Sequence, residues 1–135
     1  MRMQWSVGVG MGLCGLALGF GLGVVVGHAR PPTEYQGVAA QVVSTIDLGP
    51  DLPGYQLRLR KVTVAPGGIV ALHSHRERPG FAYILAGTVT ELRDGGYVKE
   101  YGPGGVLTES RDVTHWAENR GMTTVVAVDV DLGRP

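Results

Sequence analysis

Hydrophobic and polar positions alternate over short stretches in the part of the chain that follows residue 36. A period of two is typical of β-strands that bury one face, and short apolar runs between turns are typical of strands that bury both. Clusters rich in glycine and proline separate these stretches, and we find no helical period of useful length among them. The pattern predicts an all-β barrel or jelly roll. Its predicted strands cover residues 41–46, 55–64, 69–75, 81–85, 88–93, 97–101, 106–109, 113–117 and 123–130.

Two of these strands show how their faces differ. Residues 55–60 alternate between apolar side chains and Gln or Arg, and the apolar phase shifts by one residue at Lys61. Such a slip predicts a β-bulge, which would bend the strand as a small barrel requires. In the last predicted strand one face carries Val126, Val128 and Val130, and the other carries Ala127, Asp129 and Asp131.

The first 29 residues form a separate apolar segment. No charged side chain occurs between Trp5 and Gly27, Arg2 supplies a short positive start, and small residues precede a cleavage point before Arg30. The apolar run is also long enough to cross a hydrocarbon layer of about 30 Å. We therefore expect residues 1–29 to be a signal peptide or an N-terminal membrane anchor. The remaining residues would then lie in the periplasm or the extracellular space.

Composition limits what the exported part can be. The 135 residues suffice for one domain, with a lead and first strand over residues 30–54 and the main domain over residues 55–132. Arg2 is the only charged side chain before Arg30, so 11 of the 12 Lys and Arg remain against 12 Asp and Glu. This balance argues against a nucleic-acid-binding protein. The single cysteine, Cys14, lies in the first segment, which excludes disulfides elsewhere.

Two histidines stand two residues apart in a predicted strand that follows a Pro-Gly-Gly turn at residues 66–68. Side chains in a strand alternate between its faces, so His73 and His75 point to the same side. Neutral imidazoles are common ligands of transition metals. The pair therefore indicates a metal site on the inner face of a small β-fold, and the alternative is two ordinary histidines.

The surroundings of this pair resemble the first motif of the cupin superfamily. That motif consists of a glycine, a His-x-His pair, a glutamate and a Tyr-Val-Leu-x-Gly strand end. Gly67, the two histidines and residues 83–87 (YILAG) are similar to it. The position of the glutamate, three residues before Tyr83, is Gly80, which has no ligand to offer.

A counterpart of the second cupin motif follows at the proper separation. Gly104, His115 and Asn119 keep its spacing, although Ser110 and Asp112 replace its proline and glycine. The resemblance covers about residues 55–130. It implies a single-domain barrel of the small type-2 cupins, a double-stranded β-helix or jelly roll, preceded here by one hydrophobic N-terminal segment.

The resemblance implies a metal held by His73, His75 and His115. Three neutral imidazoles suit Fe(II), Zn(II), Mn(II), Ni(II) or Cu(II), and they leave positions open for water or substrate. Two carboxylates are candidates to replace the missing glutamate. Glu77 follows His75 closely but in a stretch typical of a loop, whereas Glu109 ends a strand six residues before His115. Glu109 is the stronger candidate, as a ligand or as a hydrogen-bond partner of a histidine, and this pattern is similar to a group of small exported cupins.

Other side chains near these motifs have ordinary interpretations. We expect the aromatic side chains of Phe81, Tyr83 and Trp116 to pack in the barrel, and Asn119 to bond a turn or a neighbouring strand. Arg76 and Arg78 either draw an anionic substrate toward the metal or belong to a solvated loop.

Two classes of function remain open. In the first, the chain is a metal-dependent enzyme, and the form we favour is an Fe(II) oxygenase that acts on a small molecule with two oxygen donors. In the second, it is a module of the cell envelope that binds or senses a metal or small ligand without turnover. Nothing in the sequence names a general base. The resemblance also implies a homodimer that pairs through its sheets.

Overall fold

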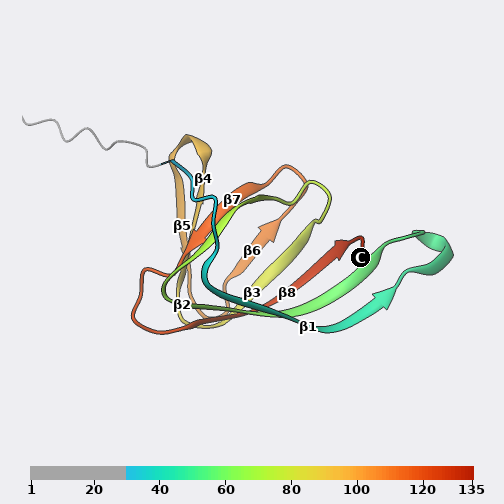
Figure 1. Ribbon diagram of the computed structural model, residues 1–135, viewed down its shortest axis with the longest axis horizontal. Coiled ribbons are helices and arrows are strands. Elements are labelled where there is room, and N and C mark those ends of the chain that lie inside the picture. The colour runs from blue at the N-terminus through green and yellow to red at the C-terminus, as the bar shows by residue number, and fades with distance from the viewer. Residues whose placement is uncertain (1–29) are drawn as a thin grey trace, which may run out of the picture.

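The computed structural model describes residues 30–135, which form a nearly closed barrel of antiparallel strands (Figure 1). The predicted signal peptide or anchor at residues 1–29 lies outside the described residues. Among residues 30–135, no helix has the length and hydropathy that crossing a membrane demands. The strands are β1 (Gln36–Asp47), β2 (Gln56–Ser74), β3 (Gly80–Ala86), β4 (Val89–Arg93), β5 (Tyr97–Tyr101), β6 (Val106–Glu109), β7 (Thr114–Glu118) and β8 (Val125–Gly133), with single 3-10 turns at Gly49–Asp51 and Asp94–Gly96.

Strand β2 connects the two halves of the barrel. The sheet runs in the order β5-β4-β7-β2-β8-β3-β6, and β1 adds to β2. The first part of β2, Gln56–Val64, pairs with β8 on one side and β1 on the other, whereas the part after Ile69 pairs with β7. In Figure 1 the β1–β2 hairpin extends away from the body, while β4, β5 and β7 rise at the opposite end.

The predicted Pro-Gly-Gly turn is a bend inside β2 rather than a break between two strands. Gly67 has a φ of +72°, a conformation that L side chains rarely adopt. A Cβ on Gly68 would lie 2.7 Å from the carbonyl oxygen of Ala65. The chain can therefore turn sharply here without leaving the sheet, and this bend carries the histidine pair to the far end of the barrel.

The bulge predicted at Lys61 is wrong. The register between β2 and β8 runs without a shift from Gln56 to Val64, and the irregularity lies instead in β1, between Val42 and Ser44. Arg58 and Arg60 share the inner face with Val62, so the apparent change of phase comes from charged side chains inside the barrel.

Strand β8 likewise turns charged side chains inward and apolar ones outward. Its buried side chains are Ala127, Asp129 and Asp131, while Val126, Val128 and Val130 are only half-buried on the outside. The carboxylates of Asp129 and Asp131 are tolerated inside because the inward arginines of β2 pair with them. One end of the interior is thus a network of ion pairs, and the remainder is an apolar core of Val64, Ala82, Ile84, Val89, Tyr101, Leu107, Ala117, Val125 and Ala127.

Candidate metal centre

Three histidines meet at the end of the barrel that β2 reaches after its bend. His73 lies near the end of β2 and faces His115 of β7 as its direct cross-strand partner. His75 follows just after β2 and is held by its own N–H, which donates to the carbonyl oxygen of Val113 at 2.9 Å. His75 and His115 are 1% and 2% exposed, and His73 is half-buried. The surrounding side chains hold the three rings in place, and the ring of His73 can still be reached from inside the barrel.

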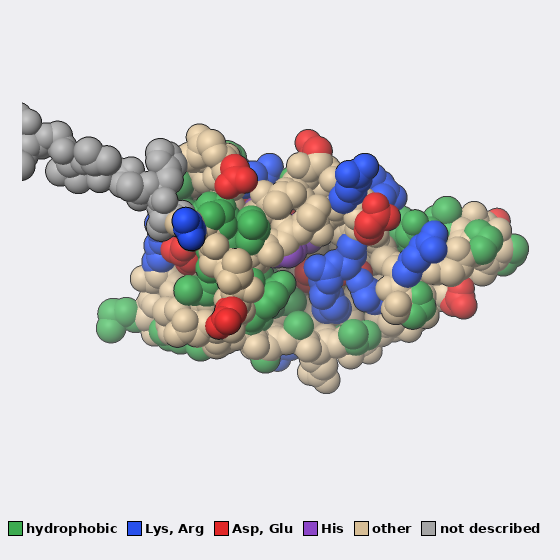
Figure 2. All heavy atoms as spheres, turned by 45° about the horizontal axis from the view of Figure 1, so that its top comes forward, with side chains coloured by type: hydrophobic (Ala, Val, Ile, Leu, Met, Phe, Trp, Pro, Cys, Tyr) green, Lys and Arg blue, Asp and Glu red, His purple; other side chains and the backbone are tan. Residues whose placement is uncertain are grey.

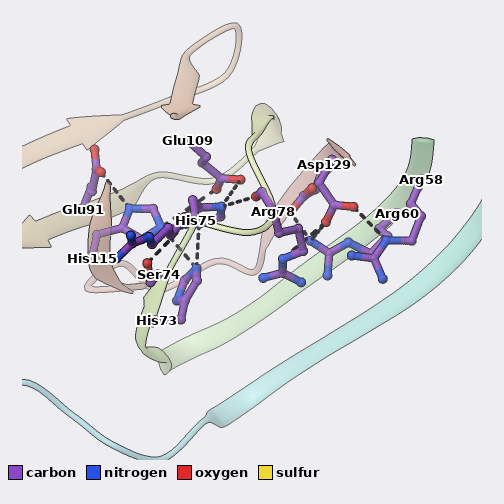
Figure 3. Close-up of polar contacts among 12 residues, drawn as sticks. Arg58, Arg60, His73, Ser74, His75, Arg78, Glu91, Glu109, His115 and Asp129 are labelled. Atoms are coloured by element: carbon purple, nitrogen blue, oxygen red, sulfur yellow. Dashed lines mark hydrogen bonds and ion pairs between the residues drawn. The ribbon is translucent and has the colours of Figure 1, made fainter. Parts of the chain in front are cut away.

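The three Nε2 atoms point at one place (Figure 3). They lie 2.9 Å apart for His73 and His75, 3.0 Å for His75 and His115, and 3.2 Å for His73 and His115. Ligand bonds of about 2.1 Å set donor atoms about 3.0 Å apart at right angles and about 3.4 Å apart at tetrahedral angles. The spacing therefore fits three ligands on one face of an octahedral ion, with the opposite face open.

The other ring nitrogens show why the Nε2 atoms are free to bind. His73 Nδ1 lies 2.8 Å from the carbonyl oxygen of Ala71, and His75 Nδ1 lies 3.0 Å from that of Arg78. Carbonyl oxygens only accept, so both Nδ1 atoms carry the proton and both Nε2 atoms present a lone pair. Burial lowers the pKa of His73 and of His75 to about 4. Both rings are therefore neutral at physiological pH, as metal ligands must be.

His115 is oriented by a residue that the sequence analysis missed. Its Nδ1 donates to Glu91 Oε1 at 2.7 Å, and Glu91 on β4 is fully buried. Burial alone would raise the pKa of Glu91, but hydrogen bonds from His115, Tyr101 and Arg93 outweigh it and lower the pKa. A carboxylate behind a histidine of this kind fixes the ring and raises its basicity. The sequence did contain a signal for this role, because Glu91 is an acidic residue on the same face of a predicted strand as Val89.

Glu109 stands beside the three histidines but not at their focus. Its Oε1 lies 4.0 Å from His115 Nε2, and its Oε2 lies 3.5 Å from His75 Nδ1. Burial, and next the charge of Asp129, raises the pKa of Glu109 to about 8. The structure thus brings Glu109 next to the histidines, but outside the cluster that His73, His75 and His115 form. Glu77 is exposed in the loop after β2 and is not part of the cluster.

Gly80 explains how a carboxylate reaches the site from β6. On β3 it pairs with Glu109 on one side and Asp131 on the other. A Cβ at Gly80 would lie 2.4 Å from the carbonyl oxygen of Val130 and 2.9 Å from the Cβ of Asp131. No side chain fits at Gly80, and the carboxylate that approaches the histidines on this side comes from Glu109 on the adjacent strand.

The Cupin domain family model matches residues 60–131 of the chain, which include all three histidines. The chain belongs to the cupin family. No curated protein matches it by sequence. Solved structures with the same fold include the polyketide cyclase RemF from Streptomyces resistomycificus, with 27% identity, a TM-score of 0.60 and coverage of 79% of this chain and 72% of that one.

Two other neighbours are more distant in sequence. A predicted oxalate decarboxylase from Thermotoga maritima is 20% identical, with a TM-score of 0.57 and coverage of 76% of this cupin and 92% of that chain. A protein from Thermus thermophilus is 19% identical, with a TM-score of 0.58 and coverage of 73% and 85%. At these identities the similarity concerns the fold.

A cavity of about 120 Å³ opens beside the histidines of this cupin. Figure 2 shows the histidines at the bottom of a hollow in the surface, with basic side chains gathered on one side. His73, His115 and Glu109 line one part of the cavity, and Arg60, Arg78 and Asp129 line another. Aliphatic side chains form most of the remaining wall: Val38, Val62, Val64, Val70, Ile84, Val89, Leu107 and Val125.

The remaining sequence predictions had mixed outcomes. Asn119 is buried and donates to the carbonyl oxygens of Val64 and Thr123, which confirms its role in the turn. Trp116 is buried as predicted, but Phe81 and Tyr83 are 56% and 46% exposed on the outer face of β3. The expectation that they pack inside is wrong, because the inward positions of this strand are Ala82 and Ile84.

Proposed function

We propose that this cupin holds a divalent transition metal at His73, His75 and His115, where it binds a small molecule in the adjoining cavity. The observation that carries the proposal is the convergence of three imidazoles whose Nε2 atoms lie within 3.2 Å of one another, with the lone pairs of His73 and His75 directed at the same place. Lone pairs at this distance repel unless a cation lies between them. His73 and His115 also line the cavity, so a metal held by the histidines would lie beside the space for a small molecule.

Among metal-dependent functions we favour an Fe(II) oxygenase acting on a small molecule with two oxygen donors. When bound, iron supplies Lewis-acid and redox chemistry at its open positions. The chain itself orients the ligands through Glu91 and the carbonyl oxygens of Ala71 and Arg78. The aliphatic wall excludes water from the bound molecule. The names of two structural neighbours, a polyketide cyclase and a predicted oxalate decarboxylase, support small-molecule chemistry.

The competing function is binding or sensing without turnover. It is favoured by one observation: among the described residues that line the cavity, only Glu109 and Asp129 carry a carboxyl group, and Glu109 lies beside His75 and His115 while Asp129 pairs with Arg60. Fe(II) loading without air, followed by oxygen and a panel of diketones, catechols and thiols, separates the two functions. Oxygen consumption supports the oxygenase, and no oxygen consumption with any compound of the panel supports the binding module.

Metal binding itself is tested by elemental analysis of the purified protein. We expect near-stoichiometric metal in the wild type and loss of most of it in His75→Ala. The matched control is Glu77→Gln, an exposed change two residues away. Full metal content in folded His75→Ala protein would contradict the proposal.

We further propose a homodimer that pairs through the outer face of the sheet β1-β2-β8-β3-β6. Six large side chains on this face are about half exposed and carry no charge: Ile46, Leu57, Phe81, Tyr83, Leu85 and Val106. At about 200 Å² for a large side chain, they expose on the order of 600 Å², as large as the largest patches on monomers. The half-buried valines of β8 lie between them. A second copy would bring the buried area close to the roughly 800 Å² per partner of stable complexes.

Export is part of the same proposal. The uncharged run from Trp5 to Gly27 supports a signal peptide or a membrane anchor that places the barrel in the periplasm or outside the cell. The amino-terminal sequence of the protein recovered from its own cell envelope distinguishes the two, because a start at Arg30 excludes a retained anchor.

A further inference from the structure

The cavity has a polar corner, made by Arg60 and Asp129, that the metal site does not require. Arg60 of β2 and Asp129 of β8 are cross-strand partners, and Arg60 Nη2 lies 2.7 Å from Asp129 Oδ2. Glu109, at the end of β6, lines the cavity beside the histidines. The side chains of Glu109 and Asp129 are 6% and 9% exposed. Figure 3 shows Arg60 and Asp129 on the opposite side of Arg78 from the histidines.

Each of these three side chains has one buried atom without a hydrogen-bond partner among the described residues. The atoms are Arg60 Nε, Glu109 Oε2 and Asp129 Oδ1. Arg58, in the same network, does not line the cavity, and its Nε donates to Asp131 Oδ1 at 2.8 Å. The Nε atom of Arg58 is thus paired, whereas three of the four unpaired buried atoms belong to residues that line the cavity. The fourth, Asp131 Oδ2, lies 2.7 Å from Arg60 Nη2. Because buried polar atoms almost always have partners in native proteins, the missing partners point to a ligand.

Two of these atoms, Arg60 Nε and Asp129 Oδ1, determine which ligand fits the polar corner. Arg60 Nε is a donor, whereas Asp129 Oδ1 belongs to a carboxylate held by Arg60 and needs a donor from the ligand. A hydroxyl group accepts and donates at the same time, so it satisfies both. A carboxylate ligand would leave Asp129 Oδ1 unpaired and would add a negative charge beside it.

The size and wall of the cavity limit the rest of the molecule. A volume of about 120 Å³ has room for on the order of ten water-sized groups, which corresponds to one ring or a short chain. Aliphatic side chains such as Val62 and Ile84 form most of the wall. We propose that the cavity selects a neutral hydroxylated small molecule of this size, a phenol, enol or alcohol, with its hydroxyl at the polar corner. This inference rests on the proposed small-molecule function of the cavity, but it does not depend on which metal is bound.

Three probes of one ring each test it by isothermal titration calorimetry: phenol, anisole as the same ring without a hydrogen to donate, and benzoate as the anion. Wild-type protein is titrated as purified and again after chelator treatment. We expect phenol to bind at least about tenfold more tightly than anisole in both forms, since its hydroxyl bonds a charged acceptor. We expect benzoate to bind no more tightly than anisole. Equal affinities of phenol and anisole, the result if water fills the corner, or tighter binding of benzoate would overturn the inference.

Two variants test whether Asp129 causes the preference for phenol over anisole. Asp129→Asn removes the charged acceptor and should reduce the preference for phenol to about threefold or less. The control, Asp131→Asn, disturbs the same ion-pair network without lining the cavity and should keep the preference. An unchanged preference in folded Asp129→Asn protein would overturn the inference, and if that variant does not fold, the wild-type comparison decides. Wild-type protein that is purified without metal but prefers phenol would refute the metal function alone, whereas metal-loaded protein without the preference would refute this inference alone.

Discussion

Replacing Glu91 by Gln tests whether the second carboxylate sets the affinity of the histidines for metal. Glu91 Oε1 accepts from His115 Nδ1 at 2.7 Å and from Arg93 Nε at 2.8 Å, while Oε2 accepts from the Tyr101 hydroxyl at 3.0 Å. In Glu91→Gln the amide oxygen takes the Oε1 position, because an amide N–H there would face two donors. The amide nitrogen then lies against Tyr101, whose hydroxyl also accepts.

This arrangement keeps the ring and tautomer of His115 but removes the charge behind it. A hydrogen bond to a charged group contributes about 1.5–3 kcal/mol and a neutral one about 0.5–1.5 kcal/mol. The midpoints of these ranges differ by about 1.3 kcal/mol, so we expect metal affinity to fall close to tenfold, at the lower end of what such partners contribute to metal sites.

The assay is competition for Co²⁺ or Zn²⁺ with a coloured chelator, with circular dichroism to confirm folding. Glu118→Gln is the matched control, because Glu118 also accepts from an arginine, Arg120 at 2.7 Å, and lies on the same strand as His115 without touching it. We expect the control to bind metal like the wild type. Affinity within twofold of the wild type in folded Glu91→Gln protein would refute the reasoning.

Three further predictions follow from burial and packing. The lowered pKa values of His73 and His75, about 4 against 6.5, make the metal-free protein more stable as pH rises from about 4 to 6.5, because only the unfolded chain still binds those protons. The raised pKa of Glu109, about 8 against 4.5, has the opposite effect from pH 4.5 to 8, so it offsets one of the two histidines below pH 6.5 and makes the protein less stable with rising pH above it. Thermal melts should therefore show a maximum near pH 6.5, and Glu109→Gln should abolish the decline toward pH 8; a decline that persists in the variant would assign it to other groups. Gly80→Ala should cost about 1–3 kcal/mol in urea unfolding through overpacking, whereas Gly102→Ala, with its nearest contact at 3.7 Å, should cost less than about 0.5 kcal/mol. Equal costs would mean that β3 and β8 can separate at Gly80. Phe81→Lys should convert the dimer to a monomer in light scattering, and Val98→Lys, at the same 56% exposure on β5, should not; a dimer that survives Phe81→Lys would place the interface elsewhere.

The sequence predicted the strands well where turns separate them. Residues 81–85, 97–101, 106–109 and 113–117 coincide within one or two positions with β3, β5, β6 and β7. These strands end at glycine-rich or polar turns, whose conformational preferences are local and readable from the residues themselves. The prediction that residues 66–68 separate two strands was wrong. A glycine pair permits a bend within one strand as readily as a turn between two, and the pairing of the later part of β2 with β7 favours the bend.

The inner and outer faces were harder to assign. In β2 and β8 the charged positions Arg58, Arg60, Asp129 and Asp131 face inward, whereas Leu57 and Leu59 of β2 and Val126, Val128 and Val130 of β8 face outward. Hydrophobicity marks the inside of a strand only where the interior is apolar. Here the interior contains ion pairs between strands far apart in the sequence, and nothing local to either strand reveals its partner.

The candidate site, too, could be predicted from the sequence only in part. The residue types and spacing of His73, His75 and His115 were enough to predict that they lie together, because a strand places alternate side chains on one side and the motif spacing fixes the third. The tertiary structure alone revealed Glu91 behind His115, the approach of Glu109 across Gly80, and the unpaired atoms of the polar corner. Each depends on which strands are neighbours and at what register, a long-range property that the order of residues along a single strand does not contain.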